Sequence, residues 1–491
     1  MSLNTKRFVI AFLSFMFLLA LLLVGYMEGN KRVMGHKAEI KVPDDSKQCV
    51  ECHNIKTPSL IAQWEDSKHA LKGVGCMECH STEEGDIDAW EHHGSKIAVV
   101  VSPKDCSKCH SHEFEEFQKS HHATAGQILG SLDNTLAEVV EGSMAHGIAL
   151  NGQSPAAVSG CLQCHGSVVK IMDNGKPDPA TWPNTGIGRI NPDGSKGSCA
   201  ACHSRHSFSP KLARNPENCG KCHLGPDHPQ KEIYDESKHG VAFRAFKEYM
   251  NLDAQPWRVG IEYTAAPTCA TCHMSATETQ AVTHDVGDRI SWTLRPPVSE
   301  KIDAKAKKLG KDVLSWEDRR ENMQDVCMKC HSSDYVEGFY TQFDAAINLY
   351  NEKFGKPSTH LYKMMKSSKL LSDVAFDDEL EWTYFYLWHH EGRRARHGAA
   401  MMGPDYTQWH GFYEVAERWY MEFIPQTREL CEEAIKHGNA SEKKAAHEVL
   451  KELDNILNRE EHEWFIGKMS DEEKARRKAA SEEFKKRYVQ D

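Results

Sequence analysis

Cysteine is nearly absent outside one repeated motif. Of the 17 cysteines among the 491 residues, only Cys431 lies outside a CxxCH sequence. A single CxxCH would leave a zinc site or a chance occurrence open, but a cysteine inventory confined to eight copies excludes both. Cys431 lies in TRELCEEAIKHG, where we expect a buried small apolar residue rather than a reactive thiol.

Each motif has the composition of a c-type haem attachment site. Two thiols on one turn form thioether bonds to the vinyl groups of a porphyrin, and the adjacent histidine coordinates the iron. The sequence therefore predicts eight covalently bound c-type haems. The attachment cysteines are Cys49, Cys52, Cys76, Cys79, Cys106, Cys109, Cys161, Cys164, Cys199, Cys202, Cys219, Cys222, Cys269, Cys272, Cys327 and Cys330, and the histidines that follow them are His53, His80, His110, His165, His203, His223, His273 and His331.

A second long apolar segment is also missing. Lys6 and Arg7 precede an apolar run from Phe8 to Val24, which is typical of an export signal. No later segment is hydrophobic enough to span a bilayer, and haem is attached to CxxCH outside the cytoplasm, so we expect a periplasmic protein. Because no good cleavage site follows Val24, we favour an uncleaved membrane anchor within residues 1–30 over a cleaved signal.

Basic residues are outnumbered. With 60 Lys and Arg against 71 Asp and Glu, the chain has a formal net charge of −11, and each ferric haem with ionised propionates adds about one more negative charge. This charge excludes a nucleic-acid-binding protein. It favours a basic redox partner, such as a small cytochrome c, or alternatively a membrane quinone-linked cytochrome.

Hydrophobic residues are scarce for so long a chain. They make up 40% of it, and apolar porphyrin discs would supply the missing core. Loop-forming Gly, Pro, Asn and Ser clusters separate the motifs, whereas apolar residues recur at helical spacing after the last one. We expect a mostly α fold with little sheet: short helices and loops wrapped around eight haems over residues 31–336, then a long-helix C-terminal bundle over residues 337–491.

The order and context of the motifs resemble the octahaem hydroxylamine oxidoreductase family, which includes hydrazine dehydrogenases and nitrite-reducing relatives. The likeness runs from about residue 45 to residue 425. Its marks are CAACHSRHSFS at the fifth motif, CGKCH followed by GPDH and then SKHG at the sixth, CATCHM followed by THD at the seventh, and GPDYTQWHG downstream of the eighth.

The resemblance implies seven haems with a histidine on each side of the iron and a fourth haem with an open side. That haem is attached at Cys161 and Cys164, with His165 as its proximal ligand. The resemblance also implies a homotrimer, in which the C-terminal helical region supplies a tyrosine to the neighbouring subunit. The implied distal ligands are His69, His93 (or His92), His146, His206, His239, His284 and His397.

The family places an acid and imidazole pair over the open haem, and the matching residues are Asp227 and His228. Oxidation of hydroxylamine or hydrazine releases protons and reduction of nitrite consumes them, so either direction needs a proton shuttle. A carboxylate beside an imidazole stabilises the imidazolium form. The alternative is a surface turn made by Pro226 and Asp227.

Two further residues bear on the direction of the reaction. In oxidising members a tyrosine is bonded to the catalytic porphyrin, and Tyr406 in GPDYTQWHG holds the matching position, with Tyr413 as a weaker candidate. Oxidising members place a second tyrosine after the seventh motif, where RISWTLRPP offers Arg295 instead. A fixed cation favours anionic nitrite over neutral hydroxylamine. Arg295 on a haem propionate is the alternative.

Three functions remain open on the sequence. The first is oxidation of hydroxylamine or hydrazine, which Tyr406 favours. The second is an ammonium-forming nitrite or hydroxylamine reductase on the same scaffold, which Arg295 and the membrane anchor favour. The third is a non-catalytic electron conduit, against which the set of Asp227, His228 and Tyr406 argues.

Overall fold

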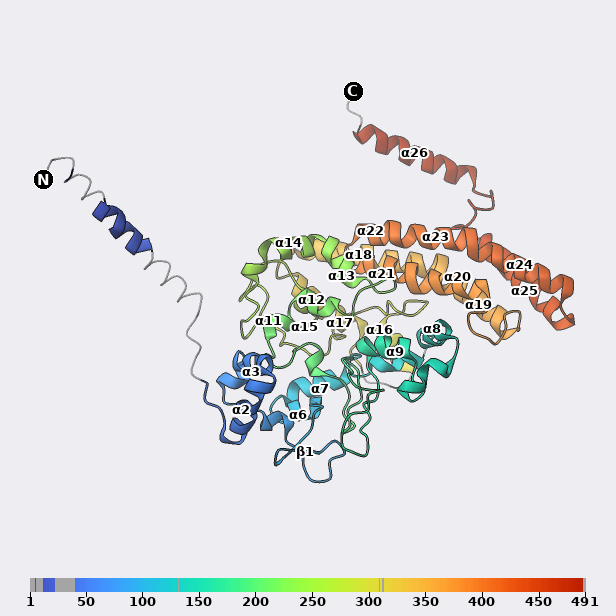
Figure 1. Ribbon diagram of the computed structural model, residues 1–491. Coiled ribbons are helices and arrows are strands. Elements are labelled where there is room, and N and C mark those ends of the chain that lie inside the picture. Colours follow the sequence, from blue (N-terminus) through green and yellow to red (C-terminus); the bar gives the residue numbers. More distant parts are fainter. Residues whose placement is uncertain are drawn as a thin grey trace.

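The computed structural model describes residues 5, 12–22, 40–130, 132–308, 310 and 313–488. Within these residues the chain is mostly helical, and the only sheet is one antiparallel hairpin. Short helices and loops make up the described residues between 40 and 332, whereas long helices run along one side of the molecule from Ser333 onward (Figure 1). The mostly α fold is confirmed, and the division into domains stays a prediction.

The described elements up to the fourth motif are short. They are η1 (Asp44–Ser46), α2 (Lys47–Lys56), α3 (Pro58–Glu65), α4 (Lys68–Leu71), α5 (Met77–His80), β1 (Trp90–His92), β2 (Ser95–Ile97), α6 (Pro103–Ser107), α7 (Ser111–Lys119), η2 (Ala125–Gly130), α8 (Leu132–Glu141), η3 (Met144–Leu150), α9 (Pro155–Ser159) and α10 (Cys161–His165). The elements from the fifth motif to the eighth are η4 (Cys199–Ala201), α11 (Pro210–Ala213), α12 (Pro216–Gly220), α13 (Gln230–Glu236), α14 (Lys238–Phe246), η5 (Lys247–Met250), α15 (Cys269–Met274), α16 (Ile302–Lys308) and α17 (Trp316–Cys327).

Local capping signals start many of these short helices. Ser154 precedes Pro155 at the start of α9, and its side chain accepts a hydrogen bond from the backbone N–H of Ala157. Thr268 caps α15 in the same way at the seventh motif. One helical turn through a CxxCH sequence brings both cysteines and the histidine to one face, which is the arrangement that haem attachment requires.

The hairpin of β1 and β2 turns at His93 and Gly94. Both residues have positive φ, 50° and 86°, as a two-residue turn between antiparallel strands requires. His92 pairs with Ser95 and ends the strand. The turn therefore fixes which of the two adjacent histidines lies in the strand.

The C-terminal region contains three long helices that π-helical turns interrupt without ending them. A π turn adds a residue to one helical turn and is frequent at functional sites. The helices are α18 (Ser333–Tyr350), η6 (Asn351–Gly355) and α19 (Lys356–Ser367); α20 (Glu379–Phe385), η7 (Tyr386–Glu391) and α21 (Gly392–Ala400); and α22 (Pro404–Thr407), η8 (Gln408–Tyr413), α23 (Glu414–Arg418), η9 (Trp419–Phe423) and α24 (Ile424–His437). They are followed by α25 (Ala440–Leu457) and by α26 (Asp471–Tyr488), which lies apart from the others (Figure 1).

Apolar packing is concentrated late in the chain. The largest cluster of buried hydrophobic residues lies among the C-terminal helices and includes Leu361, Phe385, Trp419 and Cys431, the last of these fully buried as expected. Of the described residues before Tyr234, only Leu136 packs against any of the three clusters. The region that carries the first six motifs therefore has little apolar core of its own.

The N-terminal apolar run falls partly outside the described residues. Residues 12–22 are helical and exposed, and the remainder of the run from Phe8 to Val24 lies among residues that the structure does not describe. Within the described parts of the chain, no helix combines the length and the hydrophobicity of a membrane span. The anchor and the periplasmic location stay predictions.

Candidate functional site

The attachment cysteines of different motifs are neighbours in space. Their thiols lie within hydrogen-bonding or electrostatic range of one another in the pairs Cys49 with Cys76, Cys79 with Cys106, Cys106 with Cys199, Cys202 with Cys219, Cys219 with Cys269, Cys272 with Cys327, and Cys164 with Cys222. These pairs arrange the first, second, third, fifth, sixth, seventh and eighth motifs in one row. In the same set of pairs, the fourth motif joins the row at the sixth and forms a side branch.

Histidine rings of four motifs face a second histidine across a gap that fits one iron atom. The ring centroids lie 6.1 to 6.2 Å apart. Two imidazoles on opposite sides of one iron would lie about 6.2 Å apart, given a metal–nitrogen bond of roughly 2.0 Å and a nitrogen about 1.1 Å from the ring centroid. The pairs are His53 with His92, His69 with His110, His122 with His223, and His239 with His331.

Two more motif histidines have a second histidine beside them. Burial, and then the charge of His80, lower the pKa of His206 to about 4. Burial, and then the charge of His284, lower the pKa of His203 to about 4. The donor set of paired thiols and paired imidazoles therefore fits c-type haem, and the predicted ligands His69, His206, His239 and His284 each lie beside a motif histidine.

The hairpin places His92, the alternative to His93, opposite His53. The centroids of the His53 and His92 rings are 6.2 Å apart, whereas His93 occupies the first position of the turn. His93 as an axial ligand stays a prediction that this geometry does not support.

The sixth motif faces a histidine that the sequence analysis did not select. His122 lies 6.1 Å from the His223 ring, while the predicted ligand His146 is exposed on η3. We expect His122→Ala to convert one low-spin ferric haem to a high-spin one, because the iron loses a nitrogen ligand. His146→Ala should leave the electron paramagnetic resonance spectrum of the ferric protein unchanged, and the opposite pair of results would restore His146 as the ligand.

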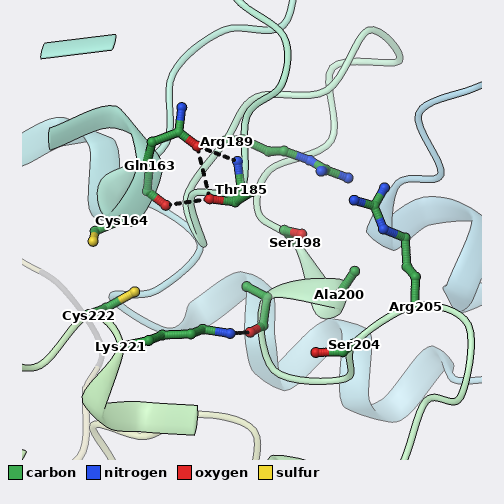
Figure 2. Close-up of a pocket in the computed structure, with 11 residues that line it drawn as sticks. Gln163, Cys164, Thr185, Arg189, Ser198, Ala200, Ser204, Arg205, Lys221 and Cys222 are labelled. Atoms are coloured by element: carbon green, nitrogen blue, oxygen red, sulfur yellow. Dashed lines mark hydrogen bonds between the residues drawn. The ribbon is translucent and has the colours of Figure 1, made fainter. Parts of the chain in front are cut away.

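A cavity of about 400 Å³ lies where the fourth, fifth and sixth motifs meet (Figure 2). The thiols of Cys164 and Cys222 lie at one end, and the guanidinium groups of Arg189 and Arg205 lie toward the other (Figure 2). Burial, and then the charge of Arg205, lower the pKa of Arg189 to about 10. Cys164 belongs to the fourth motif and Cys222 to the sixth, so the cavity borders two attachment sites. Its arginines are cations of the kind that pair with haem propionates.

Asp227 and His228 lie between the sixth motif and α13. The Nδ1 of His228 is 2.5 Å from Oδ1 of Asp227, and its Nε2 is 2.9 Å from the backbone oxygen of Cys222. Since both partners are acceptors, both ring nitrogens donate, which is the arrangement of an imidazolium. The charge of His228 also reaches Cys164 of the fourth motif, so the pair lies close to that motif.

A buried helix contacts the second oxygen of the same carboxylate. The Nη1 of Arg393 donates to Oδ2 of Asp227 at 3.1 Å, and the Nε2 of His389 is 3.8 Å from that oxygen. Burial alone would raise the pKa of Asp227, but the hydrogen bond and charge of His228 and the charges of His389 and Arg393 outweigh it and hold this pKa far below its usual range. Asp227 is therefore a carboxylate at neutral pH.

The backbone of Arg295 is hydrogen-bonded to Arg393, the arginine that contacts Asp227. Its carbonyl oxygen accepts a hydrogen bond from the Nε of Arg393 at 2.9 Å. Its side chain is exposed on the protein surface. Burial is the main reason why the pKa of His122, His223 and His397 is lowered, and the charge of Arg295 lowers each of them further. For His397, the charge of Arg396 has a larger effect than that of Arg295. The predicted cation thus lies near the His122–His223 pair and His397, and its backbone is bonded to Arg393.

His397 lies among these residues rather than beside a motif histidine named above. Its side chain is on α21, almost fully buried, and burial followed by the charges of Arg396, Arg295 and Arg393 holds its pKa well below the usual range. Its role as a distal ligand stays a prediction.

Tyr406 lies on the other side of the loop that carries Asp227. It lines a cavity of about 320 Å³ together with Gly225, Pro226, Pro229, Glu232, Arg394 and His410. Tyr413, the weaker candidate, is 51% exposed one π turn further along. A bond from either tyrosine to a porphyrin stays a prediction.

The sequence analysis missed His389 and Arg393. A signal for them exists, since His389, Arg393 and His397 recur every fourth residue in HHEGRRARH. This spacing places all three on one face of a helix. Charged residues on a buried helix face need partners of opposite charge or hydrogen-bonding groups. A helix with such a face is therefore expected to pack against other polar residues.

Comparison with known proteins agrees with this donor set. Residues 192–365 match the family described as seven times multi-haem cytochrome CxxCH, and residues 26–81 and 105–204 match the family described as cytochrome c554 and c-prime. A probable nitrite reductase-hydroxylamine oxidoreductase fusion protein of Kuenenia stuttgartiensis is 28% identical over 334 residues, which cover 59% of this chain and 34% of the relative. The chain thus spans about a third of the length of that curated relative.

Two solved structures share the fold. A hypothetical multiheme protein is 26% identical with a TM-score of 0.67, over 80% of this chain and 97% of the other. A reducing HAO-like protein complex of Kuenenia stuttgartiensis is 18% identical with a TM-score of 0.54, over 84% of this chain and 86% of the other. The second likeness is one of fold alone.

Proposed function

The chain is a multihaem cytochrome c of the hydroxylamine-oxidoreductase-like family, and from this premise we propose that it reduces nitrite to ammonium at the haem of its fourth motif. Nitrite, six electrons and eight protons give ammonium and two water molecules. Hydroxylamine, two electrons and three protons give ammonium and one water molecule at the same site. The reaction therefore needs a site that binds an anion and delivers protons repeatedly.

One observation carries the proposal: cationic groups surround one carboxylate. His228 and Arg393 bond to the two oxygens of Asp227, and His389 lies 3.8 Å from one of them. The backbone oxygen of Arg295 accepts from the same Arg393, which brings this third segment next to the group. With His228 as an imidazolium, the group carries a net positive charge, which favours anionic nitrite over neutral hydroxylamine. The name of the fusion relative contains both nitrite reductase and hydroxylamine oxidoreductase, so the charge of the site alone supports the proposed direction.

Each residue has a distinct role in this proposal. The haem, held by Cys161, Cys164 and His165, supplies an open coordination position and electrons when it is bound. Arg295 attracts and orients the nitrite oxygens, and His228 donates protons from Nε2, which in the absence of substrate donates to the Cys222 carbonyl. The negative charge of Asp227 stabilises the imidazolium form of His228, so that the ring is protonated again after each proton transfer.

Electrons would arrive along the row of motifs and enter the branch at the sixth. We propose that seven of eight haems are bis-histidine carriers, and that a cytochrome c or a membrane quinone-linked cytochrome supplies the electrons. A periplasmic location beside such a partner and a homotrimeric assembly belong to the same proposal.

Arg295 provides the test of direction. We expect Arg295→Gln to raise the KM for nitrite about tenfold or more and to leave the KM for hydroxylamine nearly unchanged, because only the anion loses a charged partner. The assay is reduction of nitrite to ammonium by the purified holoprotein with reduced methyl viologen. Arg295→Lys should recover part of the loss. Equal changes in both KM values would place Arg295 on a haem propionate instead.

Oxidation of hydroxylamine or hydrazine is the second candidate, because Tyr406 holds the position of the tyrosine that oxidising members of the family bond to the porphyrin of a neighbouring subunit. A bond between this tyrosine and the porphyrin would give the dithionite-reduced protein a red-shifted Soret band and a haem-staining species at trimer mass on a denaturing gel. Both signals together would favour oxidation. An ordinary c-type spectrum with monomer alone on the gel would favour reduction.

A further inference from the structure

Arg393 joins the two segments on which the proposed function depends. Its guanidinium is 4% exposed and lies 5.0 Å from the centroid of the Trp388 ring. Through Nη1 it donates to the side chain of Asp227, and through Nε to the backbone of Arg295. These partners lie 166 and 98 residues away in the chain, so one side chain sets the position of the acid pair relative to the cation.

His389 reaches the same carboxylate from one turn earlier. Its ring is 4% exposed and stacks on Phe385 with the ring centroids 4.1 Å apart. Its Nε2 lies 3.8 Å from Oδ2 of Asp227. His389 and Arg393 are four residues apart and therefore lie on one helix face, and the π turn of η7 ends between them.

The two oxygens of Asp227 thus have separate partners. Oδ1 contacts His228, and Oδ2 contacts Arg393 with His389 nearby. An ionised carboxylate is an acceptor only, and a guanidinium is a donor only. Arg393 therefore fixes the carboxylate as ionised and fixes its plane, and the plane in turn fixes the orientation of the His228 ring.

We propose that Arg393, assisted by His389, is the positioning residue that holds the proton donor His228 and the anion-binding Arg295 at a set distance from each other. The inference rests on the proposed function of this site and goes beyond it. It explains why a buried arginine on a C-terminal helix contacts two loops of the haem-binding region. Arg393 acts through its partners and touches no substrate.

Lysine cannot replace arginine fully in this position. The guanidinium donates from two nitrogens in fixed directions, whereas the lysine ammonium is a single point. Arg393→Lys should keep the charge beside Asp227 and lose the bond to the Arg295 carbonyl. Arg393→Gln should lose the charge as well, and His389→Gln should remove only the weaker contact.

The test measures ligand binding to the ferric holoprotein, independently of turnover. Cyanide binds as an anion and nitric oxide as a neutral molecule, and both are followed by visible absorption. We expect Arg393→Gln to raise the Kd for cyanide about tenfold, with Arg393→Lys intermediate, because a displaced donor set stabilises the bound anion less. The Kd for nitric oxide should change by less than about twofold, and the KM for nitrite should rise more than that for hydroxylamine.

The control is Arg428→Gln, which removes a partly exposed arginine of α24 that pairs with Asp454 of α25 at 3.1 Å. It should leave both ligand affinities unchanged. Equal changes for cyanide and nitric oxide in Arg393→Gln, or no change in either, would overturn the inference. If Arg393→Gln does not fold with a full haem content, Arg393→Lys and His389→Gln decide by the same criterion.

Failure of the proposed function looks different. If the ferric wild-type protein binds neither ligand, then no haem has an open side and the site is not catalytic. If the wild-type protein binds both ligands and the Arg393 variants bind them with the same affinity as wild type, the proposed function is retained and the positioning role of Arg393 is wrong.

Discussion

Replacement of His228 by glutamine is expected to lower kcat for nitrite by about a hundredfold to ten-thousandfold, the usual contribution of a positioned proton donor. The imidazolium donates from both nitrogens, to Asp227 and to the Cys222 carbonyl. Glutamine keeps a hydrogen-bonding group of similar reach but transfers no proton. The measurement is steady-state ammonium formation by holoprotein of unchanged haem content.

Asp227→Asn tests the same pair from the other side. The amide accepts from His228 but carries no charge, so the imidazolium loses its stabilising partner and kcat should fall about tenfold to a hundredfold. The matched control is His447→Gln, an exposed histidine on α25, which should leave kcat unchanged. A fall of less than about threefold in His228→Gln would remove this residue from the proton path.

Loss of the Glu381 side chain is expected to produce the largest effect on stability. Glu381 is 3% exposed and ties α19 to α20. Its Oε1 accepts from Lys366 at 2.6 Å and from Tyr362 at 3.2 Å, and its Oε2 accepts from the backbone N–H of Phe376 at 2.6 Å. Glu381→Ala leaves three donors without their acceptor, so the free energy of unfolding should fall by roughly 3 kcal/mol.

Glu381→Gln separates charge from hydrogen bonding. The amide oxygen still accepts one or two of these bonds, and the expected loss is about 1 kcal/mol. Urea unfolding followed by far-ultraviolet circular dichroism gives both values. The control is Asp373→Ala, which breaks the exposed pair with Lys369 and should cost less than about 0.5 kcal/mol. Equal losses in Glu381→Ala and Asp373→Ala would show that the buried pair does not hold the two helices together.

The fold class and the haem chemistry were predictable because each has a local signal. CxxCH specifies two thiols and an imidazole on one turn, and helical periodicity after the eighth motif specifies long amphipathic helices. The π turns had no such signal. One of them holds the buried side chains Trp419 and Phe423, and the balance between such packing and regular hydrogen bonding depends on tertiary contacts.

The second histidines beside the motif histidines were predictable where the family resemblance supplied a sequence context, and not from their separation along the chain. His69, His206, His239 and His284 were identified by context, and each lies beside a motif histidine. The choice between His92 and His93 depends on which residue takes the positive φ of the turn, a difference of one position. The choice between His122 and His146 depends on how α7 and the residues after it pack on the sixth motif, which spacing does not reveal.

The candidate site was only half predictable for a similar reason. Asp227, His228 and Arg295 come from segments close to motifs, where the family resemblance supplies a register. His389 and Arg393 come from a helix more than 50 residues after the last motif. Their partnership with Asp227 exists only after the C-terminal helices pack across the haem-binding region.

The uneven distribution of apolar packing implies an order of maturation. Among the described residues, those from Tyr234 onward bury clusters of their own, whereas the earlier ones contribute only Leu136. On the predicted export to the periplasm, the chain would cross the membrane with its least self-sufficient part first. We expect that part to depend on covalent haem attachment to become compact, so a shortage of haem should leave the leading half of the chain more open to proteases than the trailing helices.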